Sequence, residues 1–157
     1  MTLPALTKSV AVACGPAEAF QLFTAGIASW WPLKTHSVFA EDALTCVFEP
    51  RAGGRVYERS TTGGEAWWGT VILIEPGRRL FVTWHPGRPP LTAQELRVHF
   101  VASQGGTRLE LEHLGWEALG ARAEDTRKRY DTGWDEVLGQ CFAACANKKH
   151  HAAATRG

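Results

Sequence analysis

His113 is the residue of this sequence best placed to act as an acid or base near neutral pH. It follows Leu109 and Leu111 at two-residue steps, so a strand would point all three side chains toward one apolar face. An inward histidine beside a hydroxyl such as that of Tyr130 could exchange a proton with a bound molecule. The alternative is a structural histidine whose hydrogen bonds are satisfied within the core.

The aromatic residues give the strongest indication of a binding site. Seven tryptophans occur in 157 residues, and indole favours places where a core meets a wet cavity. Because most of them fall at the ends of expected elements or on an apolar helix face, we predict that they converge on one cavity. The predicted binding residues are Trp30, Trp31, Phe39, Trp68, Trp84, His113, Trp116, Tyr130, Trp134 and Leu138. The alternative is that the indoles fill the space and leave no cavity.

The other histidines give weaker evidence of a functional site. His85 and His99 alternate with apolar neighbours and are expected to face solvent, whereas His36 is expected at the mouth of the pocket. The histidines lack the spacing of metal ligands, and no nucleotide-binding or hydrolase motif is found. We therefore predict neither a metal nor a cofactor.

The charged residues of the strands are expected on the wet face of a sheet. Glu58 and the other strand glutamates alternate with apolar residues, as such a face requires. Arg55, Tyr57 and Arg59 share one strand face. They would meet an acidic ligand if that face pointed inward, but an outward, solvated face is the favoured interpretation.

The elements that must position these residues can be read from the hydrophobic pattern. A strand is expected over 9–13, followed by a helix that begins at Gly15-Pro16 and ends before Trp30-Trp31-Pro32. Turn residues then separate six more strands, and a long amphipathic helix follows over 126–147. The six strands are predicted at 44–49, 55–60, 66–74, 79–85, 93–101 and 107–114. This order predicts an α+β domain in which a seven-stranded curved antiparallel sheet surrounds the C-terminal helix.

Length and charge set limits on the class of protein. The pattern predicts a single domain over 1–147 and a flexible C-terminal tail over 148–157. With 17 basic and 16 acidic side chains, the net charge of +1 gives no field that would favour nucleic acid. No apolar run is long enough to cross a membrane and the N-terminus does not resemble a targeting segment. We expect a cytoplasmic protein whose four cysteines are reduced and pack in the core.

The chain resembles the SRPBCC (START-like, helix-grip) superfamily, in the branch named after the activator of the 90-kDa heat-shock-protein ATPase. The resemblance runs from about residue 8 to 147 and rests on an ordered set of short segments. They are Gly15-Pro16-Ala17-Glu18, Trp30-Trp31-Pro32, Phe48 to Arg55, Trp68-Gly69-Thr70-Val71, Glu75-Pro76, Thr83-Trp84, Thr107-Arg108-Leu109, His113 to Trp116, and Gly133-Trp134 with Leu138. The resemblance implies a helix-grip fold with a cavity between the sheet and the last helix.

Three functions are compatible with this resemblance. The leading hypothesis is the binding of a hydrophobic or aromatic small molecule, lipid-like or polyketide-like, without catalysis. The second is a cyclase-like or hydrolase-like enzyme that uses His113 in the same cavity. The third is a protein-interaction domain that modulates a chaperone ATPase; it is not favoured, because the eukaryotic activators carry an additional N-terminal domain that this sequence lacks. A homodimer, formed through a strand edge or the Trp30-Trp31 region, is left open.

Overall fold

The computed structural model describes the backbone of residues 3–156 and the side chains of residues 3–149. Over these residues, seven strands form one antiparallel sheet in the order β1-β7-β6-β5-β4-β3-β2. The strands are β1 (Leu6–Val12), β2 (Ala43–Phe48), β3 (Arg55–Ser60), β4 (Glu65–Glu75), β5 (Arg79–Trp84), β6 (Gln94–Ser103) and β7 (Gly106–Leu114). The predicted seven-stranded sheet is confirmed. Most strand ends lie within two residues of the predicted positions, and β1 begins three residues earlier.

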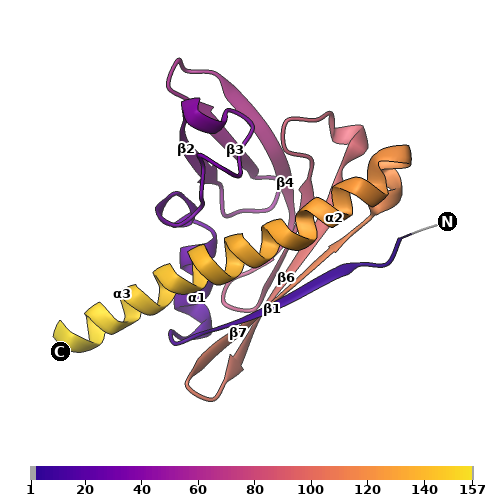
Figure 1. The fold of residues 1–157 in the computed structure, drawn as a ribbon. Coiled ribbons are helices and arrows are strands. Elements are labelled where there is room, and N and C mark those ends of the chain that lie inside the picture. The colour runs from indigo at the N-terminus through magenta and orange to yellow at the C-terminus, as the bar shows by residue number, and fades with distance from the viewer. Residues whose placement is uncertain (1–2, 157) are drawn as a thin grey trace.

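A long helix crosses the concave face of this sheet (Figure 1). It begins with α2 (Ala123–Trp134) and continues through the π-helical η5 (Asp135–Phe142) and α3 (Ala143–Arg156). The preceding η4 (Trp116–Arg122) is separated from it by non-helical backbone at Gly120. The helix-grip architecture expected from the sequence is therefore confirmed. The helix is longer than the predicted span of 126–147. The proposal of a flexible tail from residue 148 onward is untested, since α3 continues to Arg156 and the side chains beyond residue 149 are not described.

The connection between β1 and β2 holds the first helix, which packs against β6 and β7. Helix α1 (Pro16–Phe23) begins as predicted, with Gly15 in extended backbone geometry and proline at the first helical position. Two short turns follow, η1 (Ile27–Ser29) and η2 (Ala40–Asp42), and a third, η3 (Pro90–Thr92), precedes β6. The segment between η1 and η2 carries Trp30 and Trp31, and the Trp31 ring contacts both Trp68 of β4 and Trp134 of α2.

The core lies between the sheet and the helices, on the face that the alternation predicts. Leu96, Val98 and Phe100 of β6 point inward, while Glu95 and Arg97 point outward. Phenylalanines of α1, β6 and the last helix meet edge to face, with centroid separations of 5.2 Å for Phe20–Phe100 and 5.5 Å for Phe23–Phe142. All four cysteines are free: Cys14 and Cys46 are buried, and Cys141 and Cys145 pack against the same core.

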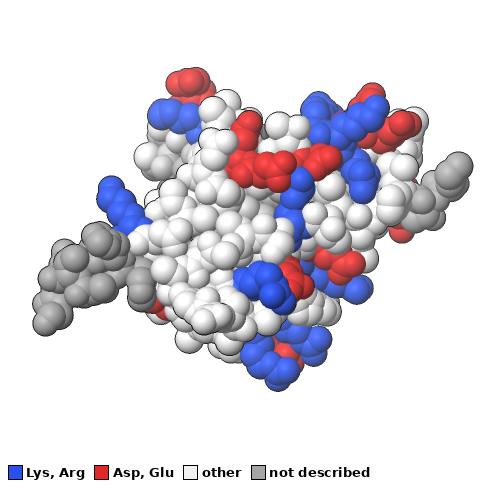
Figure 2. Space-filling model, turned by 60° about the horizontal axis from the view of Figure 1, so that its bottom comes forward, with Lys and Arg blue, Asp and Glu red and all other residues white. Residues whose placement is uncertain are grey.

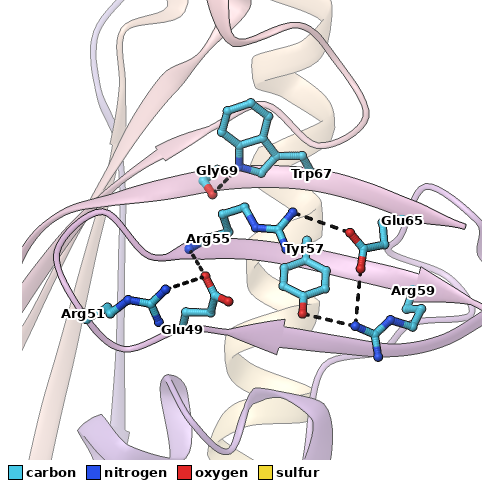
Figure 3. Close-up of polar contacts among 8 residues, drawn as sticks. All are labelled: Glu49, Arg51, Arg55, Tyr57, Arg59, Glu65, Trp67 and Gly69. Atoms are coloured by element: carbon cyan, nitrogen blue, oxygen red, sulfur yellow. Dashed lines mark hydrogen bonds and ion pairs between the residues drawn. The ribbon is translucent and has the colours of Figure 1, made fainter.

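The outer face of the sheet carries ion pairs beside exposed apolar side chains such as Trp67 and Ile72 of β4. Arg55 and Arg59 of β3 both reach Glu65 of β4, with N–O distances of 3.5 and 3.3 Å, and both lie over the ring of Tyr57 (Figure 3). This confirms that the Arg55, Tyr57 and Arg59 face is outward. Figure 2 shows acidic and basic groups scattered around a broad uncharged area, in keeping with the net charge near zero.

Candidate functional site

A cavity of about 620 Å³ lies between the last helix, the inner face of the sheet and the loops that follow η1 and β5. Five of the ten predicted binding residues line it: Trp31, Trp68, Trp84, Tyr130 and Trp134. They come from four separate parts of the chain, which the sheet and helix bring together. The alternative that the tryptophans fill the whole space is therefore wrong, because four indoles form the walls and leave the centre open.

The aromatic walls support one another. Ring centroids lie 5.0 Å apart for Trp31–Trp68, 5.7 Å for Trp68–Trp84 and 6.0 Å for Trp84–Trp134. Trp31 is also fixed by its own indole N–H, which donates to the backbone oxygen of His36 at 2.7 Å. Aromatic pairs in tilted and edge-to-face geometry each add stability beyond their buried area. The walls are therefore held in place before any ligand binds.

The other five predicted binding residues do not line the cavity. Trp30, Trp116 and Leu138 are buried in the core, and Trp30 donates to the backbone oxygen of Leu22 at 2.8 Å. Phe39 lies beside the β3–β4 turn, since its ring would meet a side chain at Gly64. Positions at element ends or on an apolar helix face can point into the core interior as well as into a cavity.

His113 is the fifth of these, and it lies behind the cavity wall. Its side chain is fully buried, and both ring nitrogens have partners. Nδ1 accepts a hydrogen bond of 3.1 Å from the indole N–H of Trp134, which requires the proton to be on Nε2, 3.3 Å from the amide oxygen of Gln94. Burial, assisted by the charge of Arg127, lowers the pKa of His113 to about 3. The ring is thus a neutral support for two cavity residues.

Glu58 is a buried carboxylate that the sequence interpretation placed on the wet face, and this placement is wrong. Its side chain is fully buried on the inner face of β3. It accepts hydrogen bonds from the backbone N–H groups of Val38 and Phe39, at 2.6 and 3.0 Å, and from the indole N–H of Trp68 at 2.7 Å. Glu58 therefore fixes the loop that forms the cavity mouth and one indole of the wall at the same time.

His85 was also expected to face solvent, and it is buried instead. Strand β5 ends at Trp84, so the alternation of faces stops one residue before His85. The backbone N–H of His85 donates to the oxygen of Trp68 at 2.6 Å, and the ring Nδ1 lies 2.9 Å from the backbone oxygen of Arg88. His85 therefore closes the turn after β5, where it lines the cavity.

His36 is found at the mouth of the cavity, as the sequence suggested. Its Nε2 lies 3.2 Å from a carboxylate oxygen of Glu136 on the last helix, and its Nδ1 lies 2.8 Å from the hydroxyl of Thr35. The pair joins the loop to the helix across the cavity mouth. Both side chains remain partly exposed, so this contact can open without disrupting the core.

The cavity floor has polar groups of its own. Burial raises the pKa of the Tyr130 phenol, and the side chain of Trp84 and the charges of Arg88 and Arg129 oppose this shift. The Trp84 indole N–H is buried without a hydrogen bond of good geometry, the one such side-chain atom found in the part of the chain that the structure describes. No group of three or more potential metal ligands is found among those residues. None of their helices is long and apolar enough to cross a membrane.

A curved antiparallel sheet closed by a long helix, with a cavity between them, defines the helix-grip class, and this architecture is consistent with ligand binding. Residues 13–146 match the family described as Activator of Hsp90 ATPase homolog 1-like protein, and the chain belongs to that family.

Several solved structures are similar to this chain. A structure of an anthrahydroquino-gamma-pyrone synthase, Txn09, complexed with a compound designated SUM, is 35% identical with a TM-score of 0.58, over 83% of this chain and 88% of that one. The self-sacrificing resistance protein CalC from Micromonospora echinospora is 27% identical with a TM-score of 0.71, over 93% and 96%. The Aha1 dimer from Colwellia psychrerythraea is 14% identical with a TM-score of 0.66, over 92% and 97%, and shows likeness of fold alone. Comparison with curated proteins gave no significant match.

Proposed function

We propose that this protein binds a planar aromatic small molecule, of polyketide-like character, in the cavity between the sheet and the last helix. The observation that carries the proposal is the cavity of about 620 Å³ whose walls are formed by four indoles and a phenol. This volume lies within the range of small-molecule sites, which are mostly apolar with a few polar groups that fix orientation.

The shape of the walls favours a flat ring system over a flexible chain. The rings of Tyr130 and Trp134 are nearly parallel, with a 24° interplanar angle, and Trp84 is tilted by 42° from Trp134. Flat aromatic surfaces stack on such rings, whereas an acyl chain gains no comparable stacking. The synthase of 35% identity, which by name acts in the chemistry of a fused aromatic product, supports the same class of ligand.

The test is a titration followed by tryptophan fluorescence, since four of the seven indoles line the cavity. A hydroxylated anthraquinone should quench the emission saturably with one site per chain, and a long-chain fatty acid should quench it more weakly. Absence of a saturable response to every planar aromatic tested would overturn the proposal.

Catalysis in the same cavity is the second candidate, favoured by the relationship to a synthase. His113 is a poor candidate for this role, because neither of its ring nitrogens is free to meet a bound molecule. His36 and His85, which line the cavity, are the groups that could exchange protons there. Mass spectrometry of the bound aromatic after incubation decides between the two: a ligand recovered unchanged supports binding alone, and a new mass or retention time supports catalysis.

An association with protein partners is kept as a further proposal. The family description and the dimeric neighbour motivate tests for a chaperone partner and for a homodimer. The location of a dimer surface stays a prediction; within one chain the side chain of Trp30 is buried and that of Trp31 lines the cavity. Light scattering during size-exclusion chromatography measures the oligomeric state. A pull-down with the 90-kDa chaperone tests the other partner.

A further inference from the structure

Of the eleven arginines whose side chains the structure describes, six pair with a glutamate and five do not, and two of those five line the cavity. Within the described residues, Arg51, Arg55, Arg59, Arg79, Arg97 and Arg108 each pair with a glutamate. Arg88 and Arg129 line the cavity, and neither has a carboxylate within 4.0 Å in the part of the chain that the structure describes. Guanidinium groups at a pocket without a protein anion are well suited to bind the anion of a ligand.

The two guanidinium groups act on the same part of the cavity. Both charges lower the pKa of the Tyr130 hydroxyl, against the larger effect of burial, so both lie within electrostatic reach of that oxygen. Arg129 is further placed by a hydrogen bond of 3.4 Å from Nη2 to the hydroxyl of Thr126, itself a buried cavity residue. Arg88 ends the turn that His85 closes, and the contact between the His85 ring and the Arg88 backbone oxygen fixes the position of the Arg88 backbone.

The third observation is the indole N–H of Trp84, which interacts with the Tyr130 hydroxyl but makes no hydrogen bond of good geometry. Its side chain is 4% exposed and lines the cavity. A buried N–H whose hydrogen bond is poorly aligned is uncommon in native proteins, and a ligand oxygen is one group that could complete it. It lies near the Tyr130 hydroxyl, because the interaction of the indole with that hydroxyl lowers the pKa of the phenol against the larger effect of burial. Two cations, a phenol and an indole N–H donor therefore lie at one end of an aromatic cavity.

We propose that the ligand is an aromatic anion, whose rings stack on the indole walls and whose acidic oxygen is bound by Arg88 and Arg129, with a further ligand oxygen accepting from the Trp84 N–H. The acidic group is a carboxylate or an ionised phenol or enol. This inference rests on the proposed function and adds the charge of the ligand to it.

The test compares two probes that differ only in charge, anthraquinone-2-carboxylate and anthraquinone-2-carboxamide, by calorimetric titration. The carboxylate is expected to bind at least about tenfold more tightly, which is the usual effect of a charge-assisted hydrogen bond. Arg88→Gln and Arg129→Gln should each remove about tenfold of the carboxylate affinity and leave the carboxamide within about twofold. Lys128→Gln removes a charge from the same helix away from the cavity, and should leave both affinities unchanged.

The outcomes distinguish a wrong ligand charge from the absence of an aromatic site. If the carboxamide binds as tightly as the carboxylate, or if Arg88→Gln and Arg129→Gln affect both probes equally, the inference about charge fails while the aromatic site stands. If neither probe binds the wild-type protein, the proposed function fails and the inference fails with it. Melting temperatures of all variants should lie close to that of the wild type, which shows that the affinities report on the site.

Discussion

The Nδ1 atom of His113 accepts a hydrogen bond of 3.1 Å from the indole N–H of Trp134, so a fully buried histidine positions a wall of the cavity without touching its contents. The same ring stacks on Trp116 at a centroid distance of 4.0 Å. His113 thus joins β7, η4 and α2 in one contact.

Substitution of His113 is predicted to reduce stability. His113→Ala would leave the Trp134 N–H without an acceptor and create a cavity beneath it, so we expect a loss of about 3–5 kcal/mol in the free energy of unfolding. Urea denaturation measures this loss, with half-buried His99→Ala as the control. A variant of unchanged stability that binds the aromatic ligand but no longer transforms it would contradict the structural role and support catalysis.

The pKa of His113 predicts a specific dependence of stability on pH. The native ring has a pKa of about 3, against about 6.5 in the unfolded chain, so between these values the unfolded state binds a proton that the native state does not. Stability should therefore fall as the pH is lowered through this interval, by up to about 1.4 kcal/mol per pH unit from this group.

The variant His113→Asn isolates that contribution, because its amide oxygen can replace Nδ1 as the acceptor and does not titrate. Denaturation curves between pH 7 and pH 4 should show a smaller slope for this variant than for the wild type. An identical slope would mean that His113 has the same pKa in the native and the unfolded state, and that burial does not lower the pKa of the native ring.

Glu58 is predicted to be essential for the cavity mouth. Glu58→Ala leaves three buried N–H donors without an acceptor, and should lower stability by about 3 kcal/mol or more. The stability of Glu58→Gln should lie between those of the wild type and Glu58→Ala, since its amide nitrogen would face one of the same donors. Glu65→Ala, which removes an exposed carboxylate one strand away, is expected to cost less than about 1 kcal/mol. Equal losses for Glu58→Ala and Glu65→Ala would remove Glu58 from this role.

Gly69 is predicted to tolerate no side chain. A Cβ placed there would lie 1.8 Å from the backbone oxygen of Thr83, so Gly69→Ala must separate β4 from β5 next to Trp68 and Trp84. Gly15→Ala is the matched control, because it meets nothing within 4 Å and has ordinary backbone geometry. Thermal unfolding should show a much lower melting temperature for Gly69→Ala and little change for Gly15→Ala.

The fold could be predicted because strand alternation and turn residues act locally. The inward face of β7 at Leu109, Leu111 and His113 followed from two-residue periodicity alone. The same periodicity also predicts that Glu58 points inward, because its neighbours Tyr57 and Arg59 point outward. The expectation that glutamates face water led to the opposite assignment. The three N–H donors that compensate for the burial of Glu58 come from distant parts of the chain and cannot be seen in its local pattern.

The cavity was harder to predict than the fold. Trp31 and Trp30 are adjacent in sequence, yet one lines the cavity and the other packs in the core. Which of them does so depends on how the loop packs between the sheet and the helix, and no sequence pattern specifies that packing. His85 and Arg88 lie in a turn, where alternation no longer assigns a face.

The central claim, that an aromatic ligand occupies the cavity, is tested most directly by filling the cavity from within. Gly133 lines it, and a Cβ there would meet the His36 ring at an ordinary 3.8 Å, so Gly133→Leu should fold while its larger side chain occupies ligand space. Gly139→Leu places the same side chain on the same helix in open space. Calorimetric titration with a hydroxylated anthraquinone should give one site in the wild type and in Gly139→Leu, with binding lost in Gly133→Leu. Equal binding by all three proteins would place the ligand elsewhere, and absence of binding by the wild type would contradict the account.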